Sequence, residues 1–563
     1  MTDKKKYLIT SALPYANSRL HFGHIAGAYL PADIFVRFLR MRGDEVIFIC
    51  GTDEYGVPIS LSAKEENVSP KEIVDKYHKS IESSFRGLNI DFDIFSGTST
   101  CPFHKDLTQE FFLNLHKQGY IESHIQQQFF CVSDSCNMFL PDRYVEGKCP
   151  FCSKPAKGDQ CDECGRWIDQ NKLIEPVCTR CGSTPVLRET KHWFLQLQKL
   201  ENDLNKWLEP KHHWKQNVYR FSMQLLKQGL KERAITRDLS WGVPVPLNEA
   251  RDKVIYVWFD APIGYISFTK ELFHNRGNEE EWKSWWQTPD VNLIHFIGKD
   301  NIIFHALLFP AMLMKMGYTL PDNVPANEFL NLEGLKQSKS KKWAVWVEDY
   351  LELLPPDLVR FYLTSEMPET QDTDFRWDSF LSRVKDMLAN NFGNLINRVL
   401  VFTKKNFDSF YPTGNVLTDF KTHPLLNKIS SLRNDVETLI LSYQFRDVLR
   451  AIMSYSSEVN RYFDSAKPWD VIKTDRDAVA HDLSACLEAT AAISVLLYPV
   501  IPAMMEDLRK TLSIKWEFSP VLYDKLGVYS LFESNQKIGS SFILVSKDDT
   551  DIIQKKILEI KNI

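Results

Sequence analysis

Two short motifs, far apart in the chain, carry the residue types that handle phosphate groups. His21 and His24 lie where a polar loop gives way to a helical pattern, and the unpaired N–H groups at a helix amino terminus favour anions. Lys336 and Lys339 lie on a loop that follows Gly334. Positioned cations and N–H donors stabilise charge that develops on phosphate oxygens, and they need no acid or base. The pair of motifs therefore predicts a single site for a nucleoside triphosphate.

Each motif also has an ordinary interpretation. Two histidines three residues apart can simply share one face of a helix, and a lysine run that continues through Lys341 and Lys342 is usually a solvated surface. Both motifs in one chain, with room for an inserted domain between them, favour the phosphate site.

The cysteines indicate structural metal. Eight of the eleven fall between positions 131 and 181, and CxxC pairs offer thiolates to a tetrahedral zinc ion. If the segment folds back on itself, an inner site and an outer site are nested, both closed and therefore structural; free thiols are the alternative for the outer set. The inner ligands are Cys149, Cys152, Cys161 and Cys164, and the outer ligands are Cys131, Cys136, Cys178 and Cys181.

The elements that position these residues follow an alternating α/β pattern. Residues 6–10 and 45–50 are apolar runs typical of buried strands, and a helical pattern over 24–41 ends at Gly43. Ser69, with Pro70 and Glu72 after it, predicts a helix start. We expect a Rossmann-type, doubly wound parallel sheet that binds its ligand at the carboxyl ends of the strands.

The pattern divides the chain into five parts. Further strands are predicted at 253–259 and 292–297, and helical periodicity dominates from 379 to 509. We expect the first half of the catalytic domain at 1–118, a connective insertion with zinc knuckles at 119–235, the second half at 236–326, a region around the lysine loop at 327–385, and a helical domain with the tail at 386–563.

Composition and charge restrict the partners and the location of the protein. The formal charge of −5 gives no overall attraction to nucleic acid, so any contact with nucleic acid depends on local basic patches. The start has no secretory or transit signal, which predicts a cytoplasmic protein. The most apolar stretch, 489–505, is too short to cross a bilayer and contains Pro499 and Pro502, so we expect a buried bundle helix and no membrane.

The chain resembles the methionyl-tRNA synthetase family over essentially its whole length. The two phosphate motifs match the HIGH and KMSKS signatures of class I aminoacyl-tRNA synthetases. Four further runs match this family in particular: ALPYAN at 12–17, FLPDR at 139–143, WFDAPIGY at 258–265 and the run from 296 to 305.

The resemblance implies a role for each matching residue. Asp53 would hold the amino group of methionine, and Asp300 would contact the ribose. His21, His24, Lys336 and Lys339 would act on ATP, which brings Mg²⁺. The methionine pocket, for which ordinary core packing is the alternative, would be lined by Leu13, Tyr15, Trp258, Ala261, Pro262, Tyr265 and His305.

The helical part resembles the anticodon-binding domain of that family. Asn394 and Arg398 are one helical turn apart, which puts an amide and a guanidinium on one face, and Trp469 offers a stacking surface. The resemblance makes these three the readers of the methionine anticodon; a core tryptophan and a surface arginine are the alternative.

Several positions depart from the family pattern. Gln337 replaces the usual methionine of KMSKS, and Lys341, Lys342 and Trp343 occupy positions where a glycine often follows. Phe309 stands where a tryptophan is common. The sequence has no appended tRNA-binding, dimerising domain, which predicts a monomer.

The predicted function is ATP-dependent charging of tRNA(Met) with methionine, through a methionyl-adenylate, for initiation and elongation. Three alternatives stand beside it: another class I synthetase, a nucleotidyltransferase with the HxGH loop, and a zinc-knuckle RNA-binding protein without enzyme activity.

Overall fold

A computed structural model describes most of the chain. The described residues are 4–134, 136–141, 144–158, 161, 164, 166, 168–337, 343–412, 422–545 and 547–562.

A five-stranded parallel sheet forms the centre of the α/β part of the chain. Its spatial order is β14-β13-β1-β2-β3, and Ile9 of β1 faces Ile294 on one side and Phe48 on the other. The strand order reverses direction between β1 and β13, so the carboxyl ends of these two strands form the switch point where α/β sheets bind ligands. This confirms the predicted fold class. The strands are β1 (Lys6–Ser11), β2 (Glu45–Thr52), β3 (Ile94–Gly97), β13 (Val291–Gly298) and β14 (Ala326–Asn327).

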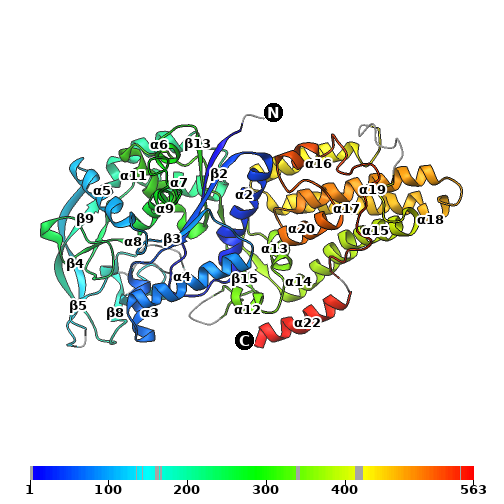
Figure 1. Cartoon of the computed structure of the whole chain (residues 1–563). Coiled ribbons are helices and arrows are strands. Elements are labelled where there is room, and N and C mark those ends of the chain that lie inside the picture. The colour runs from blue at the N-terminus through cyan, green and yellow to red at the C-terminus, as the bar shows by residue number, and fades with distance from the viewer. Residues whose placement is uncertain are drawn as a thin grey trace.

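Helices cover both faces of this sheet (Figure 1). Helix α2 (Leu30–Arg42) ends at Gly43, whose φ of 99° is the left-handed cap expected there. Helix α4 (Pro70–Gly87) begins with the predicted capping box, in which the Ser69 N–H donates to Glu72 Oε2 at 2.8 Å. The other helices near the sheet are α3 (Val57–Glu66), α5 (His104–Lys117), α9 (Gly264–Asn275), α11 (Phe309–Met316) and α13 (Pro356–Ser365).

The predicted strand over 253–259 is wrong. Only β12 (Val254–Ile255) is extended, and it pairs with β11 (Thr236–Arg237) outside the central sheet. Helix α8 (Val257–Asp260) follows at once. A short apolar run is equally compatible with a buried helix, so periodicity could not separate the two.

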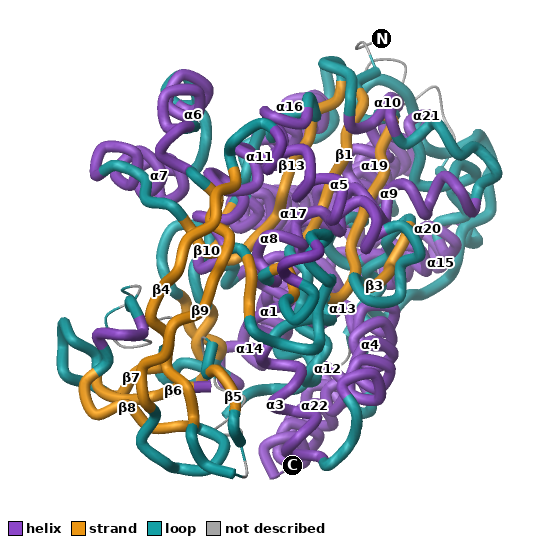
Figure 2. Tube along the Cα trace, turned by 90° about the vertical axis from the view of Figure 1, so that its left-hand side faces the viewer, coloured by secondary structure: helices purple, strands orange, loops and turns teal. Residues whose placement is uncertain are grey.

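The insertion is built on a long antiparallel ribbon (Figure 2). Strands β4 (Ile121–Cys131) and β9 (Val186–Leu195) pair from Ile121 with Leu195 to Phe130 with Val186, and β10 (Arg233–Ala234) and β5 (Met138–Phe139) complete that sheet. The far end carries a small sheet of β6 (Val145–Lys148), β7 (Pro155–Lys157) and β8 (Ile174–Cys178). Helices α6 (Glu201–Leu208) and α7 (Gln216–Gln228) lead back to the catalytic sheet.

The rest of the chain is a helical bundle beside the sheet, on the right in Figure 1. One continuous core joins the two parts, and the rings of Phe35 and Tyr443 stack across the junction at 5.3 Å. The bundle contains α14 (Trp377–Arg383), α15 (Asn394–Phe407), α16 (Asn427–Leu441), α17 (Phe445–Ala466), α18 (Pro468–Val471), α19 (Arg476–Leu497) and α20 (Pro502–Thr511), with α21 (Pro520–Lys525) and α22 (Lys547–Asn562) after them.

The apolar stretch at 489–505 is buried, but it is not a single helix. It covers the end of α19, a turn and the start of α20, because Pro499 and Pro502 interrupt the helical path. Among the described residues, α19 is the one helix long and apolar enough to cross a membrane by length and composition, and 89% of its most apolar window is buried in the bundle.

Candidate active site

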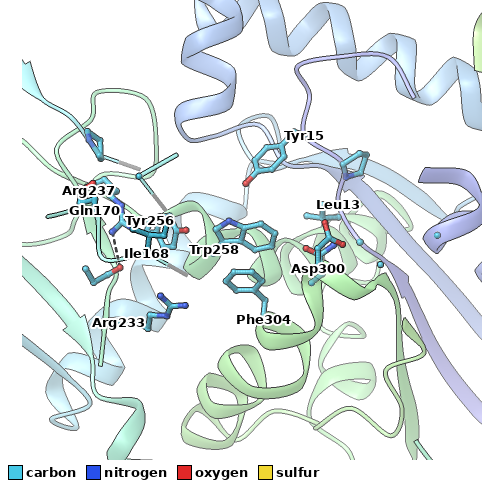
Figure 3. Close-up of a pocket in the computed structure, with 18 of the residues that line it drawn as sticks. Leu13, Tyr15, Ile168, Gln170, Arg233, Arg237, Tyr256, Trp258, Asp300 and Phe304 are labelled. Carbon is cyan, nitrogen blue, oxygen red and sulfur yellow. Dashed lines mark hydrogen bonds between the residues drawn. The ribbon is translucent and has the colours of Figure 1, made fainter. Parts of the chain in front are cut away.

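A cavity of about 980 Å³ opens at the switch point between β1 and β13. It extends from the central sheet to the insertion, and Figure 3 shows Trp258 and Phe304 between its two ends. Of the residues predicted to act on ATP or methionine, seven line it: Leu13, Tyr15, His21, His24, Trp258, Asp300 and Lys336.

The two histidines are held by the helix that they start. His21 Nδ1 accepts the Gly23 N–H at 3.1 Å, and His24 Nδ1 accepts the His21 N–H at 3.1 Å. The rings stack with 3.7 Å between centroids. Because each Nδ1 accepts a backbone hydrogen bond, each neutral ring carries its proton on Nε2. Both imidazoles are therefore fixed as Nε2–H donors at the cavity.

The second motif meets the first. A Cβ on Gly23 would lie 2.9 Å from the His21 ring and 3.1 Å from Gln337 Nε2, so the first motif packs directly against Gln337 of the second. Gln337 Nε2 donates to the Leu330 carbonyl at 2.9 Å, and the Lys336 ammonium lies 4.6 Å from the centre of the Phe329 ring. The predicted convergence holds for His21, His24 and Lys336. Lys339 lies outside the described residues, as do Lys341 and Lys342.

An aromatic wall separates the two ends of the cavity. Trp258 stacks on Phe304 with 3.8 Å between centroids and a 12° tilt, and Tyr15 meets Trp258 edge-on at 6.3 Å. Asp300 follows β13 and is exposed to the cavity. These residues come from three segments of the chain: Tyr15 and Asp300 follow β1 and β13 of the central sheet, and Trp258 lies on α8.

The other predicted methionine contacts are buried and do not line this cavity. Asp53 pairs through its backbone with Tyr15, which does line it. Burial and the nearby Asp260 raise the pKa of Asp53 well above its usual range. The Tyr265 hydroxyl lies 2.9 Å from His305 Nε2. Ala261 and Pro262 lie in the buried turn that follows α8.

Each predicted zinc set comes together in the insertion. Within each set, all four sulfur atoms lie within 4.8 Å of one another. The Cys149 and Cys164 sulfurs are 3.9 Å apart, and those of Cys152 and Cys161 are 3.6 Å apart. A tetrahedron with Zn–S bonds of about 2.3 Å has edges of about 3.8 Å, so the inner set fits the ion. The outer set fits as well, since the Cys131 and Cys181 sulfurs are 3.4 Å apart.

The three predicted anticodon residues lie together on the bundle. Asn394 Nδ2 donates to Asn460 Oδ1 at 3.3 Å. The Arg398 guanidinium lies 4.9 Å from the centre of the Phe463 ring. The centre of the Trp469 ring lies 6.3 Å from the centre of the same Phe463 ring. Arg398 also forms an ion pair with Asp464 of α17. Trp469 is 43% exposed, which is unusual for a tryptophan and leaves a surface for stacking.

Comparison with known proteins agrees with this geometry. Residues 7–400 match the family model described as class I tRNA synthetases of the methionine type, and residues 412–525 match the model of the anticodon-binding domain of methionyl-tRNA ligase. The chain belongs to the methionyl-tRNA synthetase family. The boundary between the two matches falls close to the end of α15.

Relatives of this family resemble the chain over most of its length. The methionine–tRNA ligase of Parabacteroides distasonis is 43% identical over 558 residues, which cover 98% of this chain and 80% of the relative. That of Thermococcus kodakarensis is 44% identical and covers 91% of this chain and 71% of the relative. The solved methionyl-tRNA synthetase of Mycobacterium tuberculosis with methionyl-adenylate has a TM-score of 0.78 and 25% identity, covering 96% of this chain and 99% of that one.

Several residues that line the cavity were not predicted from the sequence. Arg237 lies 3.8 Å from the centre of the Tyr256 ring at the insertion end. Phe304 lies in the run from 296 to 305 that matches the family, but the sequence does not distinguish a phenylalanine that lines a cavity from one that packs in the core. Glu328 and Phe329 follow β14, and strand ends at the switch point are the one feature that could have indicated them.

Proposed function

We propose that this chain charges tRNA(Met) with methionine in two steps. A methionine carboxylate oxygen attacks the α-phosphorus of ATP, which forms methionyl-adenylate and releases pyrophosphate. A hydroxyl of the terminal tRNA ribose then attacks the methionyl carbonyl and releases AMP. The observation that supports this best is the convergence of His21, His24 and Lys336 on one cavity at the switch point.

The phosphate residues act by holding charge. The Nε2–H groups of His21 and His24 are donors for phosphate oxygens that gain negative charge as pyrophosphate leaves. Lys336 adds a cation from the facing loop, and Lys339 is proposed to add a second. Mg²⁺ bound with ATP would neutralise part of the negative charge on the phosphates.

The methionine site is proposed around the aromatic wall. Leu13, Tyr15 and Trp258 supply apolar and aromatic surface for the thioether. Burial and Asp260 raise the pKa of Asp53. The positive charge of a methionine ammonium beside Asp53 would lower that pKa again and favour the ionised carboxylate. Asp300 is proposed to accept from the ribose. The remaining proposed contacts are Ala261, Pro262, Tyr265 and His305.

The eight thiols of the insertion are proposed to hold two structural zinc ions. Both sets are complete with four sulfurs each, and this leaves no position for a catalytic water. The metal would supply folding energy to a segment with little core of its own. Thiols stay available for zinc only where they are not oxidised to disulfides, and a reducing compartment of that kind supports a cytoplasmic location.

The remaining assignments follow the domain plan. The five segments at 1–118, 119–235, 236–326, 327–385 and 386–563 are proposed as two catalytic halves, the connective insertion, the loop region and the anticodon domain. Asn394, Arg398 and Trp469 are proposed to read the anticodon, and we expect a monomer, which light scattering measures.

Pyrophosphate exchange into ATP, driven by a panel of amino acids, tests the proposal. Methionine should drive exchange best, and the same protein should charge tRNA(Met) in a second assay. Exchange driven best by leucine or cysteine, or none with any amino acid, would contradict the proposal. Metal analysis of the purified chain gives the zinc count independently.

A further inference from the structure

The helix that carries the two histidines is irregular just after His24. Residues Ile25–Tyr29 form a π-helical turn, in which the Leu30 N–H bonds the carbonyl of Ile25. The next residue, Pro31, has no N–H. The two usual helical donors are therefore not available to the carbonyl of Ala26, which is buried. A buried carbonyl without a partner costs about 1–3 kcal/mol, so another group has to satisfy it.

The amide of Asn327 satisfies that carbonyl. Asn327 ends β14, is 3% exposed, and its Nδ2 donates to the Ala26 carbonyl at 2.9 Å. The two residues are 301 positions apart in sequence. A π-helical turn inside a helix is frequent at functional sites, and here Gly27 of the turn lines the cavity.

The ammonium of Lys215 fixes the direction of that amide. Lys215 precedes α7 in the insertion, and its Nζ donates to Asn327 Oδ1 at 2.6 Å and to the Glu369 carbonyl at 3.2 Å. A lysine can only donate, so the amide oxygen must face Lys215 and the amide nitrogen must face Ala26. Burial lowers the pKa of Lys215 to about 8, while Glu369 and Glu328 act in the opposite direction.

We propose that Lys215 and Asn327 are positioning residues for the histidine motif. Lys215 orients the Asn327 amide, which closes the π-turn and thereby sets where His21 and His24 stand against the phosphates. The contact also reaches the bundle, because the Arg446 N–H at the start of α17 donates to Glu369 Oε1 at 3.0 Å. This inference rests on the proposed function, since it concerns the rate of adenylate formation.

The test uses full-length variants in methionine-dependent pyrophosphate exchange. We expect Lys215→Met and Asn327→Leu each to lower kcat about tenfold, because small displacements of positioned groups cost rate, with KM for methionine within about twofold. The double variant should be no slower than Asn327→Leu alone, because Lys215 acts only through the Asn327 amide and has no further effect once that amide is gone. Lys211→Met is the matched control: its ammonium lies over Trp207 and Trp214 in the same segment and does not touch Asn327.

Asn327→Asp separates positioning from general stability. Aspartate keeps the size of the side chain and a pair with Lys215, but it has no N–H for the Ala26 carbonyl, so kcat should fall about as far as in Asn327→Leu, while the thermal midpoint falls less than in Asn327→Leu because the pair with Lys215 remains. Full activity of Asn327→Asp, or Lys215→Met as active as Lys211→Met, would overturn the inference. The inference would also be overturned if the loss of kcat in the double variant equalled the product of the losses in the two single variants. If wild-type protein shows no exchange, the proposed function fails instead.

Discussion

At the scale of single residues, the histidine motif shows how the backbone prepares a side chain for chemistry. His21 and His24 each use Nδ1 to accept a backbone N–H at the start of the helix, and both residues line the cavity. The cap and the proposed phosphate contact therefore need the same tautomer, so in the proposed reaction neither ring has to change its tautomer when phosphate binds.

A substitution can separate these two tasks in His24. In His24→Asn, the side-chain oxygen can still accept the His21 N–H, but the Nε2–H donor is lost. We expect kcat of pyrophosphate exchange to fall about 10²- to 10³-fold, the usual cost of one transition-state donor, with KM for methionine unchanged. His116→Asn, on α5 outside the cavity lining, is the control. A loss of less than about threefold would show that His24 only caps the helix.

At the scale of elements, the knuckles and the bundle helices act as separate units. The knuckle sheet lies at the far end of the ribbon from the catalytic sheet (Figure 2). The residues proposed to read the anticodon lie on α15 and α18, at the end of the bundle away from the central sheet (Figure 1). The bundle residues can therefore be tested apart from the cavity, whereas knuckle variants are measured by their metal content, because insertion residues such as Ile168 and Gln170 line the cavity.

The knuckle prediction concerns metal content. Cys149→Ser and Cys131→Ser should each remove one of two zinc ions per chain, because a tetrahedral site without one thiolate binds far more weakly. Cys50→Ser should retain both ions, since Cys50 is buried in the sheet. Metal analysis after dialysis measures the ratio. Loss of both ions from either variant would indicate one coupled site.

The bundle prediction separates activation from charging. Trp469→Ala and Arg398→Ala should lower the charging of tRNA(Met) at least about tenfold, because stacking on one base contributes about 1–3 kcal/mol. Pyrophosphate exchange without tRNA should not change. Tyr529→Ala removes another exposed aromatic, 62% exposed, and should affect neither assay. Equal losses in both assays would contradict an anticodon role.

The sequence predicted helix ends well where a residue close by in the sequence caps the helix. The Ser69 capping box and the Gly43 cap are short-range and were readable, and so were the two cysteine sets. The run at 253–259 was not, because burial suits a strand and a helix equally. The cavity lining was predicted only in part, since Tyr256 and Phe304 line it through packing between segments far apart in sequence.

At the scale of the whole molecule, one buried arginine ties the catalytic sheet to the bundle. Arg360 of α13 is fully buried and pairs with Asp33 of α2 at 2.6 Å. The same guanidinium donates to the carbonyls of Val500 and Pro499, at the turn between α19 and α20. The helix of the histidine motif and the bundle therefore share one set of hydrogen bonds.

Removing that guanidinium should loosen the junction. Arg360→Leu leaves buried carbonyls and the Asp33 carboxylate short of a donor, and breaking a buried pair costs about 3–5 kcal/mol. We expect a clear fall in the apparent thermal midpoint. Arg383→Leu breaks a more exposed pair with Glu366, worth no more than about 1 kcal/mol, and serves as the control. Equal midpoints for the two variants would show that the junction does not depend on Arg360.

The ribbon of β4 and β9 has a consequence for how such a chain can change. Since Ile121 pairs with Leu195, the chain enters and leaves the insertion at neighbouring points beside the central sheet. Lengthening or shortening the material beyond Phe130 and Val186 would keep those two points together. Descendants of this protein can thus exchange metal-binding modules at its tip and reshape the insertion side of the cavity, which Ile168 and Gln170 line, while the sheet side with Leu13 and His21 stays in place.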